Sequence, residues 1–131
     1  MGVRFPTTYT SVWLTTLPAS SVETLVATTP VMTTANDTGT VLVGWHINLL
    51  IGAGCTSVIF DFRRGAALTG TSLYPVSPAN VVAAGNYYLF AGCYFDVAPG
   101  GTAQYSMGIL QGGAPSVASI ILEIGLYAFQ L

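Results

Sequence analysis

Apolar and polar residues alternate with a period of two along most of this chain. Every odd position from 41 to 51 is apolar, namely Val41, Val43, Trp45, Ile47, Leu49 and Ile51. His46 and Asn48 occupy even positions of the same segment. Because successive side chains of a strand point to opposite faces, this pattern predicts a strand with one buried face and one more polar face.

The next segment, residues 56–64, follows the same alternation. Its apolar side consists of Val58, Phe60 and Phe62, and its other side carries Ser57, Asp61 and Arg63. Gly52-Ala53-Gly54 lies between the two segments and provides the backbone freedom that a tight connection needs. We therefore predict that the two segments are adjacent antiparallel strands.

Several other segments have strand patterns. The stronger ones are residues 86–97, 102–110 and 116–131, and the weaker ones are residues 8–16, 21–28 and 68–74. The last segment is apolar at odd and even positions, so both of its faces are expected to be covered. About eight strands without a helix pattern predict an all-β fold, an antiparallel β-sandwich expected as an eight-stranded jelly roll. Residues 1–20 are expected to form an N-terminal arm or edge strand, and residues 21–131 the β-sandwich domain.

The composition indicates what such a sandwich does. Of the 131 residues, 52% are hydrophobic, 6% are charged and none is lysine. A small domain has much surface for its volume, and a soluble monomer normally covers that surface with many more charges. We infer that identical or different subunits cover much of the surface. This favours a structural assembly protein over a freely diffusing enzyme.

Charge and hydropathy exclude two classes of partner. Three arginines, Arg4, Arg63 and Arg64, are too few to neutralise a run of phosphates, so no nucleic acid is expected. The most apolar window, residues 41–60, alternates in hydropathy and is interrupted by His46 and by glycines. We therefore expect no membrane-spanning helix and no membrane partner.

The two cysteines, Cys55 and Cys93, lie in or beside apolar strand patterns. This context predicts two buried thiols that pack as small hydrophobic groups. Two cysteines are too few for a disulfide scaffold, although a single bridge between them stays open.

No pattern of catalytic or metal-binding residues is present in the sequence. His46 is the only histidine, and it is expected to hydrogen-bond a neighbour across a sheet or a subunit contact. The acidic residues are scattered singly, at Glu23, Asp37, Asp61, Asp96 and Glu123. Such spacing does not support paired-acid catalysis. We predict no catalytic residue, no cofactor and no metal, and a protein that is not an enzyme.

Two groups of residues are candidates for an interface. One group lies at a strand end and consists of Asp61, Arg63 and Arg64. The planar guanidinium group of arginine is suited to an intersubunit or intrasheet ion pair with a carboxylate. The aromatic residues between 87 and 95 cannot all face one core, because neighbours in a strand point oppositely. The predicted interface residues are Asp61, Arg63, Arg64, Tyr87, Tyr88, Phe90, Tyr127 and Phe129.

Three motifs carry a family resemblance. They are Val58-Ile59-Phe60-Asp61-Phe62-Arg63-Arg64-Gly65 with Leu68-Thr69-Gly70-Thr71, the strand Thr40-Val41-Leu42-Val43, and Gly101-Thr102-Ala103-Gln104-Tyr105. From Glu23 to the C-terminus, the chain resembles small all-β structural proteins of tailed phages and other viruses. The resemblance implies a jelly-roll or tumour-necrosis-factor-like sandwich, often trimeric, that decorates or cements a capsid or forms part of a fibre. The chain departs from this family in its aromatic segment 87–95 and in lacking an obvious trimer-forming coiled coil.

The expected function is that of a non-enzymatic viral structural protein in the virion, a capsid decoration or cement protein or a minor virion subunit. Its expected partners are itself, as a homotrimer, and other virion proteins such as the major capsid protein. A threefold arrangement is preferred because the last strand, apolar on both faces, is suited to line a symmetry axis. The alternative is a carbohydrate-binding or adhesin module that uses exposed tyrosines and Trp13 or Trp45 as sugar platforms.

Overall fold

The structure is a computed structural model that describes residues 7–34, 39–68, 70–73, 79–97 and 101–131. Its strands are β1 (Thr7–Leu17), β2 (Thr24–Thr28), β3 (Met32–Thr33), β4 (Thr40–Leu50), β5 (Cys55–Arg64), β6 (Thr71–Ser72), β7 (Asn80–Val81), β8 (Tyr87–Val97), β9 (Thr102–Ala103), β10 (Tyr105–Gly113) and β11 (Ser119–Gln130). Every pairing between them is antiparallel. The predicted all-β fold is confirmed.

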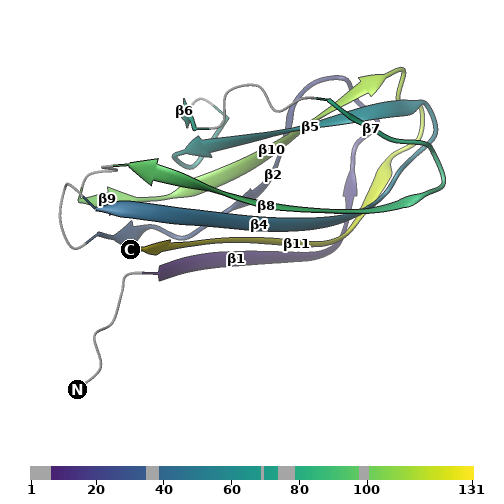
Figure 1. Ribbon diagram of the computed structural model, residues 1–131. Helices are drawn as coiled ribbons and strands as arrows, with labels where there is room; N and C mark the ends of the chain where they lie inside the picture. The colour runs from purple at the N-terminus through teal and green to yellow at the C-terminus, as the bar shows by residue number, and fades with distance from the viewer. Residues whose placement is uncertain (1–6, 35–38, 69, 74–78, 98–100) are drawn as a thin grey trace.

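The strands form two packed sheets. One has the order β1-β11-β4-β8, the other has the order β2-β10-β5-β6 with β7 also paired to β5, and β3 pairs with β9 separately. Figure 1 shows β8, β4, β11 and β1 as one layer, with β5 and β10 in the layer above it. Long strands that follow one another in the chain fall alternately in the two sheets, which is the winding of a jelly roll.

The predicted count of eight strands is not confirmed. The described residues contain eleven strand segments, four of which are only two residues long (β3, β6, β7 and β9). The predicted arm or edge strand at residues 1–20 overlaps β1, which lies at the edge of its sheet and pairs with β11. Arg4, Asp37 and Thr69 lie outside the described residues.

The predicted pairing of the segments at 41–51 and 56–64 is wrong. β4 pairs with β11 and β8, whereas β5 pairs with β10, β6 and β7. The turn at Gly52-Ala53-Gly54 therefore carries the chain from one sheet to the other. The alternation of each strand was interpreted correctly, but two strands that face each other across a core have the same alternation as two neighbours in a sheet.

The core fills the space between the sheets with the side chains that the alternation predicted to be buried. β4 contributes Val41, Val43, Ile47 and Leu49; β5 contributes Val58, Phe60 and Phe62; β10 contributes Tyr105, Met107 and Ile109. The half-buried Trp45 packs on Phe60 and Phe62, with ring centroids 5.1 and 4.9 Å apart. Aromatic pairs at this separation add to the stabilisation from apolar burial.

A bulge in β11 changes which of its residues face inward, which the prediction for the last strand did not include. The pairing of β11 with β4 shifts between Ile121 and Glu123, so Leu122 is an extra residue. Ile121 is buried before the bulge, and Ile124 and Leu126 are buried after it. The residues that face the core are therefore odd-numbered before the bulge and even-numbered after it. A uniform period of two cannot represent this change.

The prediction of two buried thiols is wrong for Cys93. Cys55 is buried in the core, whereas Cys93 is exposed on β8, and both thiols are free. The cause is that Cys93 belongs to the odd residues of β8, which are directed away from the core on the outward face of the sheet. Among the described residues, there is no helix with the length and hydropathy required to cross a membrane.

Candidate interaction surface

The outward face of the four-stranded sheet carries a stripe of apolar side chains along β8. Even positions of this strand face inward, and odd positions face outward and are exposed. The large outward residues are Tyr87, Leu89, Phe95 and Val97, which we call the β8 patch. Leu89 leaves 72% of its surface exposed. An exposed fraction this large means that no other part of the described chain covers the Leu89 side chain.

A second apolar group lies at the opposite edge of the same sheet, on β1. Tyr9, Trp13 and Leu14 are all exposed, and we call them the β1 patch. Leu14 has a φ of +46°, which L-residues with a branched side chain rarely adopt. The register of β1 with β11 is the same before and after Leu14, at Trp13–Glu123 and Thr15–Ile121, so Leu14 lies opposite Leu122, the bulge residue of β11. The positive φ of Leu14 coincides with two consecutive large apolar side chains that are exposed, Trp13 and Leu14.

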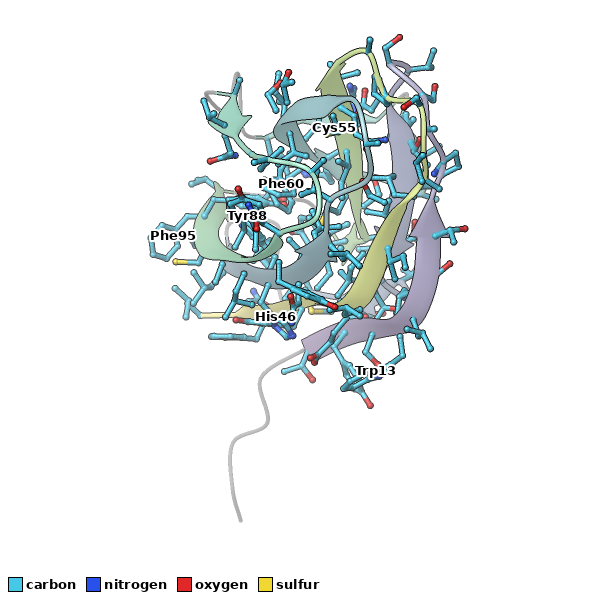
Figure 2. The ribbon with its side chains drawn as sticks, turned by 90° about the vertical axis from the view of Figure 1, so that its right-hand side faces the viewer. Trp13, His46, Cys55, Phe60, Tyr88 and Phe95 are labelled. Carbon is cyan, nitrogen blue, oxygen red and sulfur yellow. The ribbon has the colours of Figure 1, made fainter. Side chains whose placement is uncertain are left out.

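The centre of the face, between the two patches, is more polar. Nε2 of His46 lies 3.1 Å from Oε1 of Glu123, which confirms the predicted hydrogen bond across the sheet. A Cβ atom at Gly125 would overlap the His46 ring, and a Cβ at Gly44 would overlap the Tyr127 ring. The glycines of β4 and β11 thus give these rings room to lie against the sheet. Figure 2 shows Trp13, His46 and Phe95 on the outside of this sheet, whereas Phe60 and Tyr88 point between the sheets.

A buried ion pair joins three strands inside the sandwich. Asp96 of β8 is only 2% exposed and accepts hydrogen bonds from Nε of Arg64, at 2.8 Å, and from the Tyr105 hydroxyl, at 2.7 Å. Nη2 of Arg64 bonds the other carboxylate oxygen. The hydrogen bond to Asp96 raises the pKa of the Arg64 guanidinium. Burial raises the pKa of the Tyr105 hydroxyl, and the hydrogen bond to the Asp96 carboxylate and its negative charge raise it further. The network ties β5, β8 and β10 together.

Arg63, the neighbour of Arg64, lies on the opposite face of β5. Its Nη2 is 2.5 Å from Oδ2 of Asp61 and 3.6 Å from Oε2 of Glu23, and its Nη1 donates to the Gly70 carbonyl. Burial, then hydrogen bonding to Asp61, raises the pKa of Glu23. The predicted cluster of Asp61, Arg63 and Arg64 is therefore divided. Asp61 and Arg63 pair on the outside of the sandwich, and Arg64 pairs on the inside.

The predicted aromatic residues are divided in the same way. Tyr87 and Tyr127 are exposed on the outward face, where Phe129 is half-buried. Tyr88 and Phe90 face the core and stack on each other with ring centroids 5.9 Å apart. Trp45 also faces the core, so the suggestion of Trp45 as a sugar platform is wrong.

Sequence reasoning missed several residues of the two patches, namely Tyr9, Leu14, Leu89, Phe95 and Val97, as members of a predicted site. The available signal was that residues 87–97 are apolar at odd and even positions alike. In a two-layer sandwich, one of those two sets has to face away from the core.

An apolar pocket lies at one end of the sandwich, with a volume of about 490 Å³. Leu50, Ile51, Val117 and Ile120 line it together with glycines and alanines. This lining contains no acid, base or nucleophile. Within the described ranges, no group of three His, Cys, Asp or Glu side chains is placed to hold a metal ion.

No protein-family model matches the chain, and no curated protein sequence matches it. Solved structures do match. A chain in the structure of the infectious bursal disease virus Gx strain aligns with a TM-score of 0.59 and 12% identity, over 95% of this chain and 32% of that one. The VP2 subviral particle of the same virus aligns with a TM-score of 0.54 and 10% identity, over 95% of this chain and 33% of that one. The T13 viral particle aligns with a TM-score of 0.54 and 8% identity, over 95% of this chain and 35% of that one.

The chain thus spans about a third of the length of the viral chains that it matches. At these identities the likeness establishes the fold, an antiparallel β-sandwich that is shared with proteins of a viral particle. The resemblance to viral all-β structural proteins is supported at this level. The three structures described above are of infectious bursal disease virus, and they do not point to tailed phages.

Proposed function

We propose that this protein is a non-enzymatic structural component of a virus particle and that it acts through protein–protein assembly. The observation that carries the proposal is the pair of apolar patches on one sheet face of a chain with 6% charged residues. Exposed apolar patches of this kind mark interaction sites. The fold shared with proteins of viral particles supports the virion as the location, although a fold alone does not specify a function.

The proposed partners are further copies of the chain, as a homotrimer, and other virion proteins such as the major capsid protein. The finer role is that of a capsid decoration or cement protein or a minor virion subunit. Tyr127 and Phe129 of β11 lie on the same face as the two patches, which supports a role for this face in assembly. The Asp61–Arg63 ion pair, on the outward side of the other sheet, is the proposed contact that sets the register with a second partner.

The driving force is removal of apolar surface from water. Burial contributes about 25 cal/mol per Å² before the entropic cost of association is subtracted. With so few charges, this surface also meets little electrostatic opposition to close approach.

Native mass spectrometry of the purified chain tests self-association. We expect a mass three times the 13.6 kDa of one chain at micromolar concentration and moderate salt. Co-purification with virus particles from producing cells tests the location. A stable mass of one chain under these conditions contradicts the assembly proposal, and absence from purified particles contradicts the location.

A carbohydrate-binding module is the second candidate. Trp13 is 66% exposed and pairs across the sheet with Glu123, which bonds His46, so an aromatic platform lies beside polar groups. This function predicts saturable binding of the isolated domain to a glycan array, with loss of binding in Trp13→Ala. The structural function predicts no binding.

A further inference from the structure

We propose that the β8 patch of one copy binds the β1 patch of the next copy, head to tail, and that three such contacts close a ring. This inference rests on the proposed function and names the surface through which the chain assembles. The partner is a second copy of this chain. The contact is heterologous, because each copy uses its β8 patch toward one neighbour and its β1 patch toward another.

The placement of the patches supports a head-to-tail contact. β1 and β8 are the two edges of one four-stranded sheet, so the patches lie on opposite sides of the same face. Between them, on β4 and β11, the polar side chains His46, Asn48 and Glu123 lie beside the partly exposed Tyr127, so the centre of the face is less apolar than either patch. A twofold contact of the β8 patch with itself would leave Trp13 and Leu14 in water. Contact between unlike patches covers both groups with a single type of interface.

The areas are sufficient for a stable contact. An aromatic side chain has about 150–250 Å² of surface, so the exposed fractions leave on the order of 400 Å² of apolar area in each patch. Two facing patches then bury about 800 Å² of apolar surface. Because roughly 60% of a whole interface is apolar, the whole contact amounts to about 1,300 Å², at the lower end of the standard size class.

The edge of β8 also lacks the features that normally prevent strand association. Within the described residues, β8 pairs with β4 alone. Its one charged residue, Asp96, points inward to Arg64 and Tyr105. Natural edge strands are usually protected by lysine, proline or outward charges, and β8 carries none of these at its outward positions. Exposed apolar residues elsewhere, such as Val22, Val31 and Val81, are scattered singly.

The experiment is a complementation test with two double variants. Leu89→Asp with Phe95→Asp disables the β8 patch, and Tyr9→Asp with Trp13→Asp disables the β1 patch. We expect each variant alone to have the mass of one chain in native mass spectrometry. Mixed in equal amounts, they retain one intact β1 patch and one intact β8 patch on different molecules. The mixture is therefore expected to form a one-to-one heterodimer, and its formation shows that both variants are folded.

The matched control is Val31→Asp with Val81→Asp, which adds the same charge at exposed apolar positions outside both patches. It is expected to keep the mass of the wild type. A neutral second variant, Leu14→Gly, removes one side chain of the β1 patch and is expected to raise the dissociation constant about tenfold or more.

The outcomes separate this inference from the proposed function. An oligomeric wild type whose mass is unchanged in both double variants contradicts the inference and leaves the assembly function standing. Oligomerisation of one double variant by itself, or a mixture without heterodimer, also contradicts the head-to-tail contact. A monomeric wild type contradicts the proposed self-association and the inference together.

Discussion

Arg63 and Arg64 are adjacent in the chain and have different surroundings. The Arg64 side chain pairs with a carboxylate that is almost completely buried, and Tyr105 donates to the same carboxylate. The Arg63 side chain pairs with Asp61 and Glu23, each of which keeps a fifth or more of its side-chain surface in water. The period-two geometry of the strand causes this difference. The energetic importance of each arginine follows from the burial of its partner.

This difference predicts unequal costs for one substitution at two neighbouring positions. Arg64→Met leaves the Asp96 carboxylate buried without its cation, and we expect a loss of about 3 kcal/mol in the free energy of unfolding. Arg63→Met is the matched control, with an expected loss of about 1 kcal/mol or less, because its partners reach solvent. Urea denaturation followed by tryptophan fluorescence measures both values. Equal losses would contradict the structural role assigned to Asp96.

At the scale of elements, the bulge of β11 and the left-handed residue of β1 opposite it decide which side chains are exposed. Leu122 is an extra residue relative to β4, Leu14 lies opposite it on β1, and the parity of β11 changes at this point. The backbone of Leu14 is in the left-handed region, at a cost of roughly 1–2 kcal/mol for a non-glycine residue. The position that carries this strain also holds an exposed apolar side chain of the β1 patch. Strain of this kind is frequent at functional sites.

The variant Leu14→Gly is therefore expected to affect folding stability and self-association differently. Glycine adopts a positive φ without steric cost, so we expect the unfolding free energy of the dissociated chain to stay equal or to rise by up to about 1 kcal/mol. Self-association is expected to weaken in the same variant. Thermal melts at low concentration, combined with sedimentation at high concentration, measure the two effects. As a control, Val12→Gly is expected to destabilise the fold, because Val12 packs against the core. A clear loss of stability in Leu14→Gly would count against strain at this position.

At the scale of the whole molecule, the two cysteines report on assembly. Cys93 is exposed on the outward side of β8, between Leu89 and Phe95, whereas Cys55 is buried in the core. In the proposed ring, the neighbouring copy covers the outward side of β8. The single chain exposes it.

We expect maleimide to modify Cys93 at least about tenfold more slowly in the wild-type oligomer than in the Leu89→Asp, Phe95→Asp variant. Cys55 is the internal control and is expected to stay unmodified in both proteins as long as they are folded. Mass spectrometry of the labelled chains identifies which thiol has reacted. Equal rates at Cys93 in the oligomer and in the monomeric variant would place the interface elsewhere.

The candidate site was predictable in part. Tyr87, Tyr127 and Phe129 were predicted for an interface and lie on the outward face, whose role in assembly stays a proposal. Tyr88 and Phe90 were predicted with them and face the core. The sequence shows that residues 87 and 88 point in opposite directions. It does not show which direction is inward, because both alternate sets of this strand are apolar.

The sequence by itself determined the strand character of the long segments and, where one alternate set is apolar and the other polar, the face that is buried. Val41 to Leu49 and Val58 to Phe62 are such cases, and the reason is local, since the extended backbone directs successive side chains to opposite sides. Only the tertiary structure decided which strands pair, where bulges change the parity, and which apolar set stays in water. Those outcomes depend on contacts between residues distant in the chain, such as β1 with β11 and Arg64 with Asp96, which no local pattern encodes.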